Sequence, residues 1–250
     1  MIQVLQLVKK YGSFTAVDDV SLEVAAGEIH GFLGPNGAGK TTTIRIIGGL
    51  LKPTAGRVVI DGHDLAVAPA QAKNALGFIP DRPFLYDKLT ANEFLRFHAG
   101  LYGLEGDPVT HRIDELLDLF ELRAWAGELV ESFSHGMKQR LVMCAAFLHR
   151  PRGVLVDEPM VGLDPRGARL IKDIFRAMSR KGVAILMSTH TLEVAQEMCD
   201  RISIIQHGKI IARGTVPELQ ALAGGTDEQL TSVFLRLTGG SGLQEIDGAI

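Results

Sequence analysis

Residues 34–42, Gly-Pro-Asn-Gly-Ala-Gly-Lys-Thr-Thr, match the phosphate-binding pattern G-x-x-x-x-G-K-S/T without a mismatch. Glycines allow such a loop to turn tightly and to aim its backbone N–H groups inward, where they form an anion site with the start of the next helix. We expect Lys40 to reach the β- and γ-phosphates of a nucleoside triphosphate, and the Thr41 hydroxyl to ligate Mg²⁺. The candidate nucleotide-binding residues are Gly34, Pro35, Asn36, Gly37, Ala38, Gly39, Lys40, Thr41 and Thr42.

The segments on either side of this loop have the character that a phosphate loop requires. Residues 28–33 predict a short buried strand that runs into the loop, and residues 42–47 predict an amphipathic helix that leaves it. Strand, glycine loop and helix in this order are the structural context of the motif. The alternative is a glycine-rich turn with a fortuitous lysine, which does not require these two neighbours.

A pair of carboxylates follows a second short apolar run. Residues 154–156, Val-Leu-Val, predict a strand that ends at Asp157 and Glu158. Side chains alternate along a strand, but the chain turns at the end of one, so adjacent carboxylates can serve different parts of one site. We assign Asp157 to Mg²⁺, directly or through water, and Glu158 to the general base that activates a water. Taken alone, the pair also fits an exposed acidic strand end.

Residues 183–190 predict another buried parallel strand, with the polar tip Ser-Thr-His. Ligand groups lie at the carboxyl ends of the strands in an open α/β sheet, so His190 is expected to contact the γ-phosphate or the attacking water. A lone histidine is more often structural, and the other histidines of the chain carry no independent functional signal.

Composition limits the class of protein. The 46% hydrophobic content supports a packed core in this chain of 250 residues. No stretch approaches the roughly 18–20 apolar residues of a membrane span, and the first residues lack the pattern of a signal peptide. We therefore expect a soluble chain that reaches a membrane only through a partner. The net charge of −3 argues against a nucleic-acid binder, and Cys144 and Cys199, which lack metal-site spacing, are expected to be reduced.

Several segments, in this order along the chain, resemble the ATP-binding-cassette (ABC) ATPases, and the resemblance covers nearly the whole chain. Residues 133–137, Phe-Ser-His-Gly-Met, resemble the signature that the family usually writes Leu-Ser-Gly-Gly-Gln. Residues 162–164 resemble the loop that crosses the family's dimer interface, and residues 188–190 resemble the segment of its switch histidine. Tyr11 stands where the family has the aromatic residue that stacks on adenine.

This resemblance implies that the nucleotide is ATP and that a second ATPase subunit closes over it. Ser134 and Gly136 would then touch the γ-phosphate bound by the opposite subunit. The physical basis is the one that applies to the phosphate loop, because N–H groups and a hydroxyl at the start of a helix attract anions. Without the family, residues 133–140 are only a serine N-cap before an amphipathic helix.

Three residues depart from the family pattern. His135 replaces the first signature glycine, and Met137 replaces the signature glutamine. Asp81 stands just after Ile79 and Pro80, where the family has a glutamine linked to the metal. An aspartate keeps an oxygen ligand but has a shorter reach, so we expect Asp81 to contact Mg²⁺ through water. The other catalytic residues are present, and an active ATPase is expected.

Strand and helix signals predict an α/β fold, which the resemblance specifies as a P-loop NTPase (RecA-like) core with a small antiparallel β layer and an inserted helical lobe. We assign residues 1–81 and 151–215 to the nucleotide-binding core, 82–150 to the helical signature lobe and 216–250 to a C-terminal tail. Together they form one ABC transporter domain over about residues 2–237. The segments behind this division are strands at 2–7, 17–24 and 58–60 and helices at 91–102, 112–120, 135–149 and 216–222, with disorder expected from about residue 240.

The resemblance implies the ATP-binding subunit of an ABC transporter, which hydrolyses ATP at a head-to-tail dimer interface. A polytopic membrane permease on a separate chain would be its partner, and the ATPase would lie peripherally on the cytoplasmic face of the cell membrane. Two copies of this chain or two different chains both fit the dimer. Residues 227–239 resemble the tail of bacterial exporter ATPases, which favours export. The alternative is a soluble ABC ATPase that acts on DNA or ribosomes, but those relatives usually carry a coiled coil or two cassettes.

Residues 80–86 lie between core and lobe in this division and contain two aromatic residues. We expect Phe84, Leu85 and Tyr86 to form part of the surface that docks on the permease. Packing of the three side chains inside the lobe is the alternative.

Overall fold

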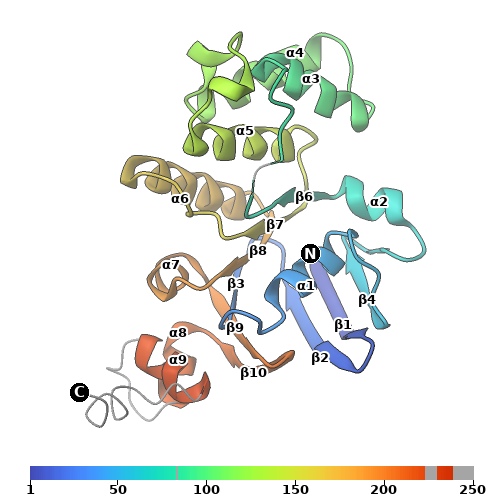
Figure 1. Cartoon of the computed structure of the whole chain (residues 1–250), viewed down its shortest axis with the longest axis vertical. Coiled ribbons are helices and arrows are strands. Elements are labelled where there is room, and N and C mark those ends of the chain that lie inside the picture. The colour runs from blue at the N-terminus through green and yellow to red at the C-terminus, as the bar shows by residue number, and fades with distance from the viewer. Residues whose placement is uncertain (83, 223–229, 239–250) are drawn as a thin grey trace.

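The computed structural model describes residues 1–82, 84–222 and 230–238, and within these residues the chain forms two β-sheets with helices packed around them (Figure 1). The larger sheet has the strand order β10-β9-β3-β8-β7-β6. Its strands are β3 (Ile29–Leu33), β6 (Leu76–Ile79), β7 (Gly153–Asp157), β8 (Ala184–Thr189), β9 (Arg201–Gln206) and β10 (Lys209–Gly214). All neighbours pair in parallel except β9 and β10. The α/β fold predicted from the sequence is confirmed.

The second sheet is small and antiparallel, as predicted, with the order β2-β1-β4-β5. Its strands are β1 (Ile2–Tyr11), β2 (Phe14–Val24), β4 (Ala55–Ile60) and β5 (His63–Asp64). Helix α1 (Lys40–Ile47) lies between the two sheets, and its Ile44, Ile46 and Ile47 are fully buried. One hydrophobic cluster joins these residues to both sheets, so α1 is held from two sides.

The central strands are apolar because helices cover them. Every residue of β7 and β8 is buried, which is typical of parallel strands shielded on both faces. The remaining helices of the core and tail are α2 (Pro69–Asn74), α6 (Pro165–Arg180), α7 (Leu192–Met198), α8 (Val216–Leu222) and α9 (Leu230–Thr238). Helix α6 buries Ile171, Ile174 and Phe175, a spacing of three and four residues that places one apolar stripe on the sheet.

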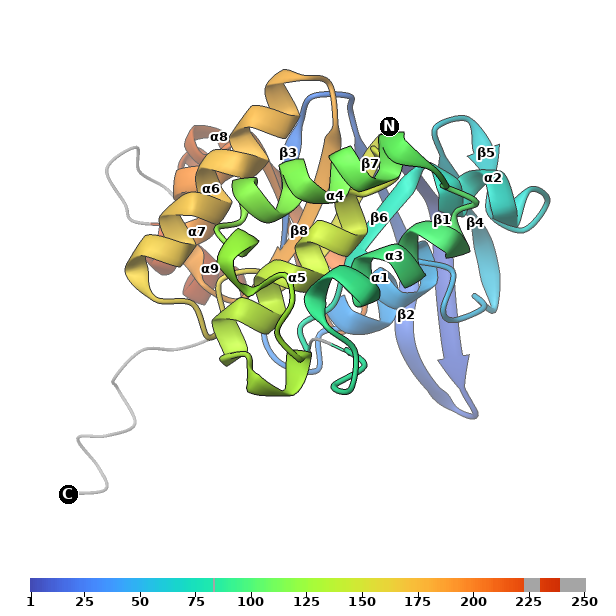
Figure 2. The ribbon, with the colours of Figure 1, turned by 90° about the horizontal axis from the view of Figure 1, so that it is seen from above.

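Between β6 and β7 the chain is helical, as expected for residues 82–150. The segment contains α3 (Ala91–Leu101), α4 (Asp107–Leu119), two short 3₁₀ turns (Arg123–Trp125 and Val130–Ser132) and α5 (His135–Phe147). Seen from above, these helices lie over strands β6–β8 (Figure 2). One cluster of buried side chains joins α3, α4 and α5 to α6 and to the strands below, so the helices pack directly on the sheet.

Two sequence predictions about these helices need correction. Helix α4 begins at Asp107, five residues before the predicted start at 112, because Gly106 adopts φ 79 and Pro108 stands in the first turn, where proline favours a helix start. Helix α5 is not amphipathic over its second half, since every residue from Leu141 to Phe147 is buried.

No helix in the described part of the chain is long and apolar enough to cross a membrane. The predicted helix at 216–222 is confirmed as α8. The disorder expected from about residue 240 falls outside the described residues. The boundaries that divide core, lobe and tail stay predictions.

Candidate functional site

The phosphate loop connects β3 to α1 and lies tightly against neighbouring backbone. A Cβ added at Gly34 would lie 2.3 Å from the carbonyl oxygen of Ile205 on β9. A Cβ at Gly39 would lie 2.6 Å from the carbonyl oxygen of Ala16 on β2, and Gly39 also has φ 108, which L side chains rarely adopt. These two positions therefore require glycine for reasons that the surrounding fold imposes.

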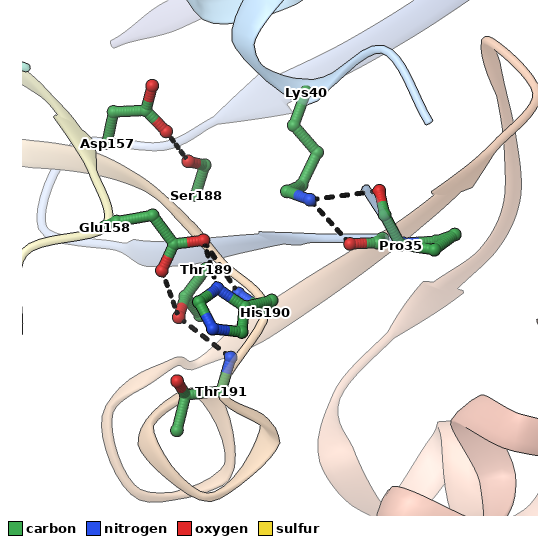
Figure 3. Close-up of polar contacts among 9 residues, drawn as sticks. Pro35, Lys40, Asp157, Glu158, Ser188, Thr189, His190 and Thr191 are labelled. Carbon is green, nitrogen blue, oxygen red and sulfur yellow. Dashed lines mark hydrogen bonds and ion pairs between the residues drawn. The ribbon is translucent and has the colours of Figure 1, made fainter. Parts of the chain in front are cut away.

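Lys40 is the first residue of α1, and its side chain folds back over the loop (Figure 3). Its Nζ donates to the carbonyl oxygens of Gly34 at 2.6 Å and Pro35 at 3.2 Å. Burial lowers the pKa of Lys40, whereas the charges of Glu158 and Asp157 act in the opposite direction. The ammonium group thus lies between the loop carbonyls and two carboxylates, where phosphate oxygens would be stronger partners.

The other loop residues divide into anchors and exposed groups. Ala38 is buried, whereas Pro35, Asn36, Gly37 and Thr41 are exposed and Thr42 is half-buried. Thr43, which sequence reasoning did not single out, is buried and donates its hydroxyl to the carbonyl of Gly39 at 2.9 Å. That bond ties the first turn of α1 to the loop.

Asp157 is the last residue of β7 and is 5% exposed. The hydroxyl of Ser188 on β8 donates to its carboxylate, and the two residues are paired in the register of the sheet (Figure 3). Burial raises the pKa of Asp157, and the Ser188 hydrogen bond partly offsets this. A buried carboxylate with a raised pKa is a group that a cation would stabilise.

Three groups at the end of β8 hold the carboxylate of Glu158: a hydroxyl, a backbone N–H and a ring nitrogen. Thr189 Oγ1 donates to Oε2 at 3.1 Å, the backbone N–H of His190 donates to Oε1 at 3.0 Å, and His190 Nδ1 lies 2.7 Å from Oε1 (Figure 3). Glu158 has φ 52, a backbone conformation that costs energy in a residue other than glycine and that occurs often at functional sites. Its side chain is 17% exposed and that of His190 is 60% exposed, so the pair can be reached from solvent.

The fold thus brings the phosphate loop, Asp157, Glu158 and His190 to one edge of the central sheet, because β3, β7 and β8 are parallel and end together. The supporting roles of Ser188 and Thr189 were missed by sequence reasoning. Their only signal was their place at the polar tip of an apolar strand.

Asp81 follows β6 and is exposed. Its charge is one of the causes that raise the pKa of Asp157, after burial, so the two carboxylates lie within electrostatic range. Asp81 Oδ1 accepts a hydrogen bond from the N–H of Arg82 at 2.8 Å. The side chain lies beside the site but is not part of its hydrogen-bond network among the described residues.

The remaining candidates lie apart from this edge. Ser134 is the exposed N-cap of α5, and its hydroxyl accepts from the N–H of Met137 at 3.3 Å. Gly136 lies beside the loop that precedes α6, where an added Cβ would be 3.5 Å from the carbonyl oxygen of Gly162. Tyr11 ends β1, is 50% exposed, and has Lys9 Nζ 5.0 Å from its ring centre. In the part of the chain that the structure describes, no hydrogen bond, ion pair or ring contact joins these residues to the phosphate loop.

The oxygen groups at the site could hold Mg²⁺ together with the phosphates of a nucleotide. Among the described residues there is no cluster of three or more His, Cys, Asp or Glu side chains that would hold a metal ion by itself. Asp157 is instead a single buried carboxylate next to a phosphate loop, and the Thr41 hydroxyl stands at the start of α1. Mg²⁺ is commonly bound by one or two protein groups together with the phosphates of a substrate. Asp157 and Thr41 therefore fit a Mg²⁺ ion that is bound together with a nucleotide.

Comparison with known proteins decides the family. Residues 17–161 match the family model described as ABC transporter. The chain belongs to the ABC transporter family. The probable multidrug ABC transporter ATP-binding protein YbhF of Escherichia coli (strain K12) is 39% identical to it over 229 residues, which cover 92% of this chain and 39% of YbhF. This ABC family member therefore spans well under half the length of YbhF.

Other relatives match this ABC chain over more of their own length. The linearmycin resistance ATP-binding protein LnrL of Bacillus subtilis (strain 168) is 38% identical, with 92% of this chain and 75% of LnrL covered. A solved structure of an ATP-binding subunit of an ABC transporter has a TM-score of 0.89 at 34% identity, covering 95% of this chain and 99% of the other. The ATP-binding cassette MJ0796, solved as a dimer bound to ADP and Pi, has a TM-score of 0.79 at 26% identity, with 86% and 99% covered. These matches confirm the predicted P-loop NTPase fold class and the predicted family.

Proposed function

We propose that this chain is the ATP-hydrolysing subunit of an ABC transporter, that it works as a head-to-tail dimer, and that it drives a separate membrane permease. The observation that carries the proposal is the position of Glu158. Its carboxylate lies at the strand edge shared with the phosphate loop and Asp157, and His190 holds it at 2.7 Å. A restrained carboxylate beside a phosphate site is what the activation of a water for attack on a phosphoryl group requires.

Each residue has a distinct role in this proposal. The phosphate loop and Lys40 bind the β- and γ-phosphates, and Tyr11 stacks on adenine. Glu158 accepts the proton of the attacking water, while His190 and Thr189 keep its carboxylate in place. Mg²⁺, when bound, would neutralise charge on the phosphates, held by Thr41 and Asp157 and, through water, by Asp81.

The proposed dimer would bring Ser134 and Gly136, which lie apart from the phosphate loop of their own chain, to the phosphate loop of a second subunit. Ser134 and Gly136 stand at the start of α5, where N–H groups without helical partners attract an anion. A second subunit in head-to-tail orientation would present these groups to the γ-phosphate at the first subunit's loop. ATP then favours closure because the closed dimer makes phosphate contacts that the open one lacks. Both subunits being copies of this chain is the simplest arrangement, and the dimeric state of the related cassette MJ0796 supports it.

A permease would dock between the lobe and the core. A cavity of about 300 Å³ lies there, lined among others by Phe84, His98 and Tyr102. Phe84 is 91% exposed, and Tyr86 is 53% exposed with its ring against Phe97 at 5.3 Å. Leu85, by contrast, packs against the core of the lobe, so we assign docking to Phe84 and Tyr86 and not to Leu85.

The direction of transport is proposed to be export, from the names of the relatives. YbhF is named for multidrug transport and LnrL for linearmycin resistance. Such a role would put this chain at the cytoplasmic face of the cell membrane, as a peripheral subunit. Copurification of a polytopic membrane protein with the chain from its native host tests the permease partner.

The experiment that tests hydrolysis is Glu158→Gln, which keeps the size of the side chain and removes the base. We expect kcat to fall by about a thousandfold, while ATP binding persists. The blocked protein should accumulate as an ATP-bound dimer, visible as an ATP-dependent doubling of mass in size-exclusion chromatography. Glu193→Gln, on an exposed carboxylate in the first turn of α7, is the matched control and should behave like the unaltered chain. Near-normal turnover by Glu158→Gln would remove Glu158 from the role of base.

A further inference from the structure

A second hollow lies between α4 and α6 and is separate from the candidate ATP site. It has a volume of about 810 Å³ and is bordered by α4, α6, the end of α5 and the loops before β7 and β8. The ribbons of α4 and α6 can be followed in Figure 2. These loops lie at the amino ends of strands whose carboxyl ends carry Asp157 and Thr189. We call it the α4–α6 groove, and its size falls in the range of small-molecule sites.

The two helices run in opposite directions along the groove. At one end, Arg166 in the first turn of α6 pairs with Glu121, just beyond α4, at 2.6 Å. At the other end, Arg112 of α4 donates to the carbonyl oxygen of Phe147, the last residue of α5, at 3.0 Å. Residues near the end of α4 therefore face residues near the start of α6.

The part of the groove near Glu121 and Arg166 is apolar. Leu119 and Leu170 lie at this end, and the other apolar lining residues continue toward the opposite end: Leu116, Ile174, Phe147 and Met178. Leu119 is 46% exposed although it is a large hydrophobic side chain. Exposed apolar surface set into a concavity is the usual lining of a site for an apolar group.

The opposite end of the groove is cationic. Arg150 and Arg152 come from the loop before β7, and Lys181 comes from the loop before β8. The N–H of Ala184 donates to the carbonyl oxygen of Arg152 at 3.0 Å, which holds the two loops side by side. None of these three charged groups makes a hydrogen bond or ion pair with another described residue, but Arg150 lies near enough to Glu115 to help lower the pKa of that carboxyl.

Two acidic residues also border the groove and offset part of this charge. Arg112 Nη1 binds Glu115 at 3.1 Å, so that carboxylate already has a cation. Asp173 is exposed on α6, between the apolar and the cationic ends. Arg152 and Lys181 are left without a hydrogen bond or ion pair to another described residue, and an anion in the groove would be attracted to them.

We propose that the α4–α6 groove binds a long-chain carboxylate, with its head group on Arg150, Arg152 and Lys181 and its hydrocarbon chain along Leu116, Leu119 and Leu170. The positions of the polar and apolar residues match such an amphipathic anion end to end. From Leu170 to Lys181 the helix rises by roughly 16 Å, a length that suits an extended fatty acyl chain. This site does not depend on ATP hydrolysis, because none of its residues belongs to the candidate ATP site.

The test is isothermal titration of the full chain with myristate below its micellar concentration. We expect saturable one-to-one binding of myristate, and no saturable binding of acetate or of myristyl alcohol, which lack the chain and the charge respectively. The double variant Arg152→Ala/Lys181→Ala should bind about tenfold more weakly, and Leu119→Asp should also weaken binding. All three positions are exposed, so these variants are expected to fold, which thermal unfolding checks.

Arg180→Ala is the matched control, because Arg180 is an exposed cation next to Lys181 that does not line the groove. It should bind myristate like the unaltered chain. Equal binding by the double variant and by Arg180→Ala, or no binding of myristate by the unaltered chain, would overturn the proposal.

A second experiment measures binding of the chain to vesicles of phosphatidylglycerol. Binding to vesicles without binding to free myristate would assign the cationic end to a membrane surface and would also overturn it. Normal ATP turnover together with absent myristate binding would leave the proposed ATPase function intact.

Discussion

Replacement of Gly39 by alanine tests whether the phosphate loop is held by its contact with β2. The structure gives two costs at this position. The backbone has φ 108 and ψ 1, and the new Cβ would lie 2.6 Å from the carbonyl oxygen of Ala16, a backbone atom that cannot move aside without shifting β2. Backbone strain costs about 1–3 kcal/mol, and the overlap costs a similar amount. We expect Gly39→Ala to lower the free energy of unfolding by about 3 kcal/mol.

The matched control is Gly37→Ala, two residues earlier in the same loop. Gly37 also has a positive φ of 79, but a Cβ there would meet nothing within 4 Å. Only the cost of the positive φ applies at Gly37, so we expect Gly37→Ala to lower the free energy of unfolding by about 1 kcal/mol. Urea unfolding of the ligand-free chain measures both values, and the difference of about 2 kcal/mol corresponds to roughly 4–8 °C in the midpoint of thermal unfolding. Equal losses for the two variants would refute the argument that the contact with Ala16 shapes the loop.

Two further predictions concern residues of the candidate site. Burial raises the pKa of Asp157 in the folded chain, so the ionised carboxylate destabilises the fold. This destabilisation is absent at pH values below the ordinary aspartate pKa. It is complete at pH values above the raised pKa that Asp157 has in the folded chain. Asp157→Asn should therefore raise the free energy of unfolding of the ligand-free chain at neutral pH by about 1 kcal/mol, with the gain lost below about pH 4; a less stable variant at neutral pH would contradict this. Tyr11→Ala should raise the KM for ATP about tenfold with little change in kcat or in unfolding, because the ring is half-exposed and base stacking is its proposed role. Tyr11→Phe is the control and should retain the KM, and an unchanged KM in Tyr11→Ala would argue against stacking.

Short-range patterns explain why much of the fold could be predicted. The short apolar runs at β3, β7 and β8 favour strands of a parallel sheet that is covered on both faces, and the glycine loop after β3 has a known geometry. The start of α4 was misplaced because the periodicity of its buried residues begins late, at Ile113, whereas the glycine and proline that set the start lie before it. Composition could not show which side chains of residues 84–86 are exposed. Phe84 and Tyr86 are exposed, and the leucine between them packs inward.

The network around Glu158 could not be predicted from spacing. Thr189 and His190 contact it although they are 31 and 32 residues away in the chain. Their meeting depends on the parallel register of β7 and β8, and on the positive φ of Glu158, which no local pattern indicates. The α4–α6 groove is a similar case, because its cations and its leucines come from segments that only the packing of α4 against α6 brings together.

The sequence by itself determined which groups are available for chemistry, since the phosphate loop, the two carboxylates and the histidine are identified by residue type and order. It also determined that the loop lies between a strand and a helix, because hydrophobic periodicity is a local property. The tertiary structure decided which of these groups meet, how Glu158 is held, and why Gly34 and Gly39 admit no side chain. The physical reason is that hydrogen bonds, burial and van der Waals overlap depend on distances between segments far apart in the chain, which are set only when the sheet closes and the helices pack on it.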